Sequence, residues 1–70
     1  MIDWSQCILN IRNSTGNSVS TIARKIDSTE RHLNRIVREE VAEPKFSKGL
    51  QLLDLHLDAC GIDKHRELLR

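Results

Sequence analysis

Apolar residues recur at three- and four-residue intervals along most of this chain, as the buried face of an α-helix requires. The first series consists of Trp4, Cys7, Ile8 and Ile11. Asp3 precedes this series and is a suitable N-cap. A polar run over residues 13–17 ends it, because its Gly16 readily takes the positive φ angle found after many helices. The pattern predicts a first helix over residues 4–14.

Two short helices are predicted next, separated by a polar corner over residues 27–29. Ser18 can cap the first of them, whose inward residues are Val19, Ile22, Ala23 and Ile26. At the corner, Asp27 is one of the few residue types other than glycine that tolerate a left-handed backbone. The second helix starts near Glu30, and its inward residues are Leu33, Ile36 and Val37. Two short helices joined in this way form a helix-turn-helix.

The segment after this motif permits two interpretations. Pro44 disfavours helix at the residue before it, so residues 38–44 are expected to form a loop. Residues 53–59 alternate between apolar and polar, as a half-buried strand does. They also fit two helical stripes, the first made of Leu50, Leu53, Leu57 and Cys60 and the second of Leu52, Leu55 and Ala59. We favour a helix from about Ser47 to residue 60, because Leu and Ala are stronger helix formers than strand formers.

Length and composition favour one small domain over residues 1–70. A chain of 70 residues buries only about 60% of its unfolded surface, so dimerisation would help to stabilise it. Trp4 and Phe46 are the only aromatic residues, which predicts an aliphatic core with Phe46 and Val41 packed against it. A last short helix is predicted from Asp63, with Leu68 and Leu69 closing over the core or a dimer, and a frayed end is the alternative. The fold class is thus all-α, a helix-turn-helix bundle of four to five helices, with a C-terminal β-strand as the alternative.

The charges are unevenly distributed along the chain. The net charge is only +1, but residues 12–38 carry six basic and two acidic groups, whereas residues 39–63 carry two basic and six acidic groups. The balance is therefore +4 over the helix-turn-helix and −4 over the next segment. Such polarity would orient the motif toward phosphates. Apolar runs are too short for a membrane span and no leader-like segment opens the chain, so we expect a cytoplasmic protein.

The helix-turn-helix and the residues after it resemble the phage Cro and λ-type repressor family. The resemblance covers residues 3–57. It rests on the small residue Ala23 where the two helices touch, on the inward Ile26, Leu33 and Ile36, and on Pro44-Lys45-Phe46 at the position of a similar Pro-basic-Phe sequence. This chain has Asp27 where the family usually has glycine, and Ser28 where an apolar residue is usual.

The resemblance implies a sequence-specific regulator that binds double-stranded DNA, a repressor of phage or prophage type. A homodimer would read two half-sites about 34 Å apart on a palindromic operator. Arg can pair with guanine and Asn with adenine in the major groove. Base reading is accordingly assigned to Thr29, Glu30, Arg31, Asn34 and Arg35. Contacts with the DNA backbone are assigned to Asn17, Ser18, Ser20, Arg38, Lys45 and Lys48.

Residues 47–70 are also a candidate dimerisation segment. A helix with two apolar stripes has more apolar surface than one small core can cover. The second stripe is therefore assigned to the homodimer interface: Leu52, Leu55 and Ala59. The alternative function is a protein-interaction module that has the same fold, binds a partner protein through the acidic, leucine-rich C-terminal half and does not bind DNA.

No catalytic residue, cofactor or small-molecule substrate is expected. The sequence has no phosphate-binding loop, nucleophile motif or pair of catalytic carboxylates. His56 and Cys60 would share a helical face, but no third or fourth metal ligand lies near them in the sequence, so we expect no metal site. Cys7 and Cys60 are expected to be packed thiols rather than parts of a disulfide scaffold.

Overall fold

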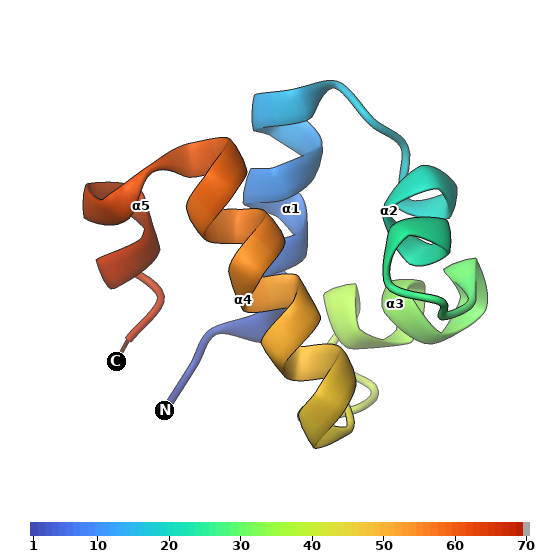
Figure 1. Cartoon of the computed structure of the whole chain (residues 1–70). Helices are drawn as coiled ribbons and strands as arrows, with labels where there is room; N and C mark the ends of the chain where they lie inside the picture. The colour runs from blue at the N-terminus through green and yellow to red at the C-terminus, as the bar shows by residue number, and fades with distance from the viewer. Residues whose placement is uncertain (70) are drawn as a thin grey trace.

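The computed structural model describes residues 1–69 and contains five helices in that range (Figure 1). In chain order they are α1 (Trp4–Thr15), α2 (Val19–Lys25), α3 (Glu30–Val37), α4 (Phe46–Cys60) and α5 (Ile62–Arg66). Residues 1–69 include no β-strand, only an isolated antiparallel bridge between Ile2 and Leu69. The predicted small all-α bundle is confirmed. The alternative of a C-terminal strand is wrong, because residues 51–59 lie inside α4.

Helices α1 and α4 form the centre of the bundle and pack against each other. Figure 1 places the α2–α3 pair on one side of them and α5 on the other side, beside α4. The two ends of the described chain meet, since the backbone N–H of Asp3 donates to the carbonyl of Leu68 at 3.0 Å. Basic residues on the outer side of α2 and α3, among them Arg24 and Arg35, are exposed.

The core is aliphatic, as the composition predicts. Its buried residues are Cys7, Ile8, Ile11, Ile22, Ala23, Ile26, Leu33, Ile36, Leu52 and Leu68. Val41 packs against this cluster as expected, but the prediction that Phe46 belongs to the core is wrong, since it is 82% exposed. The indole of Trp4 fills the space beside α4, at 3.0 Å from the position that a Cβ on Gly49 would take. Trp4, and not Phe46, is thus the aromatic residue that packs against the core.

The helix ends follow from local side chains. Asp3, Ser18 and Thr29 are the N-caps of the first three helices, and the side chain of each accepts from the backbone N–H three residues later, at 3.1–3.2 Å. Gly16 closes α1 with a φ angle of 74°, as predicted. Helix α4 begins at Phe46, one residue before Ser47, so Ser47 lies inside the helix and is not its cap.

A chain of polar contacts joins α1, α4 and α5. Gln6 Nε2 donates to Asn10 Oδ1 at 2.8 Å, so the Asn10 amide nitrogen is left to donate to His56 Nε2 at 3.1 Å. His56 Nδ1 then carries the proton and donates to His65 Nδ1 at 3.0 Å. Burial lowers the pKa of His56, and the charges of His65 and Lys64 lower it further. The neutral imidazole of His56 is thus a structural link between helices.

The last helix begins at Ile62, one residue before the predicted start. Leu68 is buried and closes over the core, whereas Leu69 is exposed. None of the helices within residues 1–69 combines the length and the apolar character that crossing a membrane requires.

Candidate nucleic-acid interface

Helices α2 and α3 are joined by a tight turn of the kind that the sequence predicts. Asp27 has a φ angle of 54° and takes the left-handed conformation for which glycine is usual. The N–H of Ser28 donates to the carbonyl of Ala23 at 2.8 Å, and the N–H of Asp27 donates to the carbonyl of Arg24 at 3.2 Å. These bonds form a Schellman motif at the end of α2. The chain therefore forms this turn with Asp27 in place of a glycine.

Five of the seven residues predicted to face inward from these helices are buried, and the other two, Val19 and Val37, are partly buried and pack against the core. Ile22, Ala23 and Ile26 of α2, and Leu33 and Ile36 of α3, are at most 2% exposed. This packing fixes the rotation of α3 about its own axis, because these side chains must face the core. The outward side of α3 is determined by the same constraint.

The five residues assigned to base reading lie together on α3 and its N-cap. Arg31, Arg35, Thr29 and Glu30 are exposed, and Asn34 is partly exposed. Thr29 also caps the helix, since its Oγ1 accepts from the N–H of His32 at 3.1 Å. The arrangement offers two guanidinium groups and one amide to an approaching ligand.

Residues assigned to the DNA backbone lie at several helix ends. Ser18 caps α2, Ser20 is partly exposed in its first turn, and Asn17 lies just before it. Arg38 is exposed at the C-cap of α3, and Lys45 is exposed at the N-cap position of α4, which has no side-chain cap.

Lys48 has a role that the sequence does not reveal. Its Nζ donates to the carbonyl of Ile26 at 2.8 Å and to the carbonyl of Asp27 at 2.9 Å. These carbonyls lie at the C-terminal end of α2, where orphan acceptors and the helix dipole favour a cation. Two of the three donors of the ammonium group are thus used within the protein, and Lys48 attaches α4 to the helix-turn-helix. The structure shows this internal contact, and the DNA contact assigned to Lys48 stays a prediction.

Three charged residues near α3 were not assigned a role from the sequence. Arg24 and Lys25 are exposed on α2, and the positive balance of residues 12–38 was the signal that could have identified them. Glu40 forms ion pairs with the Nε atoms of Arg38, at 2.7 Å, and Arg35, at 3.9 Å. A carboxylate therefore lies beside the basic face.

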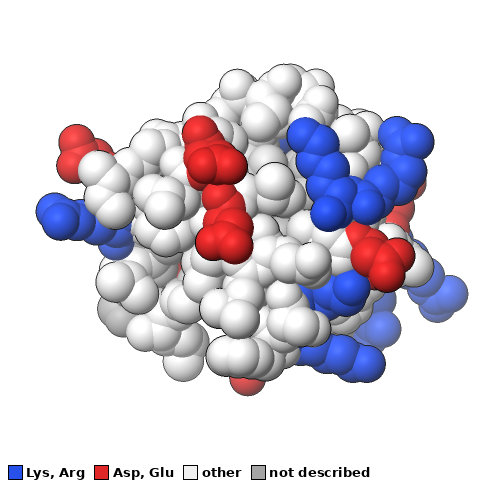
Figure 2. All heavy atoms as spheres, in the orientation of Figure 1, with Lys and Arg blue, Asp and Glu red and all other residues white. Residues whose placement is uncertain are grey.

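The charges divide between the two halves of the bundle as the sequence suggests. Figure 2 shows Lys and Arg side chains gathered mainly on the side formed by α2 and α3, with acidic side chains over α4. The helix-turn-helix is thus the most positive part of the surface in this view. This distribution favours an anionic ligand on the α2–α3 side.

One of the three dimer residues assigned from the sequence needs correction. Leu52 is completely buried, so it cannot contact a second copy. Leu55 packs against the core, and Ala59 is only partly exposed. The assignment of Leu52 is wrong because this residue lies in the core, whereas the assignments of Leu55 and Ala59 stay predictions. The exposed apolar residues of α4 belong to its other side: Phe46, Leu50 and Leu57.

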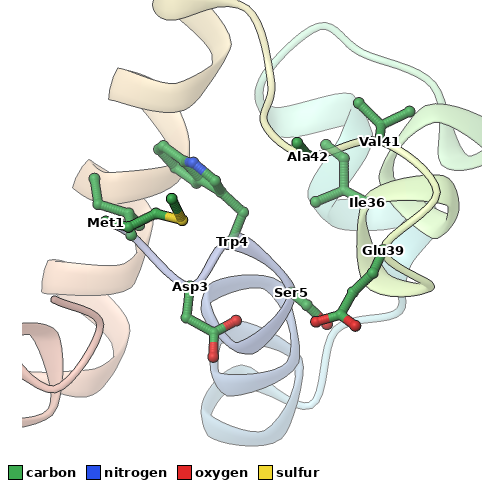
Figure 3. A pocket seen from close by; sticks show the side chains of 9 residues that line it. Met1, Asp3, Trp4, Ser5, Ile36, Glu39, Val41 and Ala42 are labelled. Carbon is green, nitrogen blue, oxygen red and sulfur yellow. The ribbon is translucent and has the colours of Figure 1, made fainter. Parts of the chain in front are cut away.

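Two hollows are lined in part by Trp4. A groove of about 260 Å³ runs beside the first half of α4, where Trp4 and Pro44 face Phe46 and Leu50. A second hollow, of about 360 Å³, lies between the N-terminal segment and the loop after α3. Figure 3 shows Asp3 and Glu39 with their carboxylates at the edge of this second hollow.

The polar residues of the central helices form no metal site. Within residues 1–69 no three His, Cys, Asp or Glu side chains are grouped so as to hold a metal ion. His56 contacts Asn10 and His65, whereas the Cys60 thiol lies 3.2 Å from Ser14 Oγ. Burial raises the pKa of Cys7 to about 12, with smaller contributions from Cys60 and Asp3, so this thiol stays protonated and unreactive.

Comparisons with known proteins identify no relative of this chain. No protein-family model matches the chain, and neither the curated proteins nor the solved structures contain a match. The inference of function accordingly depends on the geometry of α2 and α3.

Proposed function

We propose that this protein is a sequence-specific regulator of transcription that binds double-stranded DNA, a Cro-like repressor of phage or prophage type that acts in the cytoplasm. One observation carries the proposal. Helix α3 is held by buried residues on its inner side and presents Arg31, Asn34 and Arg35 outward, on the positive side of the molecule.

The chemistry of this face suits the major groove, which is wide enough to admit an α-helix. Arg31 and Arg35 can each donate two hydrogen bonds to guanine, and Asn34 can exchange two with adenine. Exposed cations on the neighbouring elements, Arg24, Lys25 and Lys45, would neutralise phosphates on either side of the groove. Repression follows if the bound site overlaps a promoter.

A palindromic operator requires a second copy of the chain. The molecule measures 28 × 25 × 20 Å, so it is too short to reach two half-sites about 34 Å apart. The exposed apolar stripe of α4, formed by Phe46, Leu50 and Leu57, is the surface we assign to the homodimer. Leucine and phenylalanine side chains of this size stabilise an interface when they leave water.

The rival function is a protein-interaction module, and the apolar groove beside Phe46 and Leu50 favours it. In that case a partner protein would occupy the groove, and the outward side of α3 would have no ligand. The two functions therefore differ in whether Arg35 is needed for binding, since Leu50 would serve the homodimer in one and the partner protein in the other.

Selection of bound sequences from random duplexes, repeated at two salt concentrations, tests the proposal. We expect a palindromic site whose affinity falls steeply with salt. Arg35→Ala should weaken binding to that site by about 1–3 kcal/mol, whereas Arg12→Ala, on α1, should change it little. Weak binding without enrichment of any sequence, or equal affinity of the two variants, would overturn the proposal.

A further inference from the structure

A carboxylate is paired with two arginines that the proposed function needs. Glu40 Oε2 accepts from Arg38 Nε at 2.7 Å, and Glu40 Oε1 lies 3.9 Å from Arg35 Nε. Arg35 is assigned to base reading and Arg38 to the DNA backbone. Both guanidinium groups thus have an anionic partner before any DNA arrives.

The backbone after α3 holds this carboxylate in place. Glu39 has a φ angle of 61°, a left-handed conformation that costs a non-glycine residue energy. The N–H of Glu40 donates to the carbonyl of Arg35, and the N–H of Glu39 donates to the carbonyl of Ile36, both at 2.9 Å. These two bonds form a Schellman motif. The motif folds residue 40 back over the last turn of α3.

DNA must compete with this carboxylate. Carboxylate and phosphate oxygens accept from the same guanidinium donors, and Glu40 would repel a phosphate placed beside Arg38. In a complex with unrelated DNA, Arg35 has no matching base and can remain with Glu40. In a complex with the operator, a guanine edge replaces Glu40 at Arg35.

We propose that Glu40 is an autoinhibitory counter-charge that competes with DNA for Arg35 and Arg38, and that it weakens binding to the operator, where both pairs are displaced, at least as much as binding to unrelated DNA. The inference rests on the proposed function. Its energetic scale is that of two exposed ion pairs, each equivalent to a factor of about 1.4–5 in affinity.

Glu40→Gln tests the inference, because glutamine keeps the backbone hydrogen bonds and removes the charge. Glu39→Gln is the matched control. It removes one negative charge from the adjacent residue, whose carboxylate borders the hollow toward Asp3 and Ser5 (Figure 3) and forms no ion pair with Arg35 or Arg38. Urea unfolding of both variants shows that they are folded before DNA is added.

Both variants and the wild type are titrated with the selected operator and with an unrelated duplex over a series of salt concentrations. Relative to the control, Glu40→Gln should bind the operator about three- to tenfold more tightly at low salt. It should gain less on the unrelated duplex, where the released Arg35 has only a phosphate to bind, so the ratio of specific to non-specific affinity should not fall. One added phosphate contact by Arg35 should make the salt dependence for the unrelated duplex steeper, by about 0.9 in log–log slope.

Each outcome is decisive. Equal affinities of Glu40→Gln and Glu39→Gln for the operator would overturn the inference and leave the proposed function intact. Weaker binding by Glu40→Gln would also overturn it, because Glu40 would then orient the two arginines for DNA. If none of the three proteins binds any duplex, the proposed function falls, and the inference falls with it.

Discussion

Lys48→Met should destabilise the fold by releasing α4 from the helix-turn-helix. The Nζ atom of Lys48 donates to the carbonyls of Ile26 and Asp27 at 2.8 and 2.9 Å. Methionine keeps most of the apolar stem but has no donor, so both carbonyls lose this partner. The bonds join residues more than twenty positions apart in the chain, and hence two separate elements of the bundle.

The size of the effect follows from the surroundings of the two bonds. A hydrogen bond from a charged donor contributes about 1.5–3 kcal/mol, but the bond to Asp27 is exposed and that to Ile26 is only partly buried. Water can replace part of the lost bonding, so we expect a total loss of about 1–2 kcal/mol. In a domain of this size such a loss lowers the unfolding midpoint by about 5–10 °C.

Thermal and urea unfolding followed by circular dichroism measure this change, and Lys45→Met is the control. Lys45 has the same charge and lies exposed at the same end of α4. If the two variants are equally stable, the internal role of Lys48 is refuted. A normal stability combined with a weaker salt dependence of DNA binding would instead restore Lys48 as a phosphate contact.

Three further changes have defined outcomes. Glu39→Gly should raise the free energy of unfolding by about 0.5–1 kcal/mol in urea titrations, because glycine takes the positive φ angle of 61° without strain; a loss of stability would contradict this. The lowered pKa of His56 means that the unfolded chain binds more protons, so stability is present above about pH 6.5 and falls below it, by at most about 1.4 kcal/mol per pH unit. His56→Leu should remove this dependence and His32→Gln should retain it, and equal pH profiles of unfolding in the two variants would exclude His56 as its source. Leu50→Glu, at a side chain that is 49% exposed, should shift sedimentation toward the monomer without unfolding the domain, and an unchanged dimer would remove the α4 stripe from the interface.

The charge separation illustrates what composition alone hides. A net charge of +1 is uninformative for a DNA-binding protein, whereas the division of charge along the chain placed the positive half on α2 and α3. The same division included Arg24 and Lys25 without assigning them a role. The distribution of charge along the sequence also gives no indication that Glu40, which belongs to the acidic segment, pairs with Arg35 and Arg38.

The sequence by itself determined the helices and the helix-turn-helix, because their signals are local. Periodic apolar residues define each inward side, and the capping side chains of Asp3 and Ser18 accept from backbone N–H groups only three residues later. Asp27 could be predicted at the turn because its tolerance of positive φ belongs to the residue type. Even the ambiguous segment over residues 51–59 could be identified as helix from its leucine-rich composition.

Only the tertiary structure decided which side of α4 is buried. Both apolar stripes of that helix satisfy the same periodicity, and the position of α1 selects the one containing Leu52, leaving Leu50 at the surface. The partners of Lys48 and Glu40 could not be predicted from the sequence either. Lys48 bonds to carbonyls across the bundle, and Glu40 meets Arg35 through a left-handed residue that local preference disfavours. Such contacts depend on where separate elements come to lie, and periodicity along one element carries no information about that.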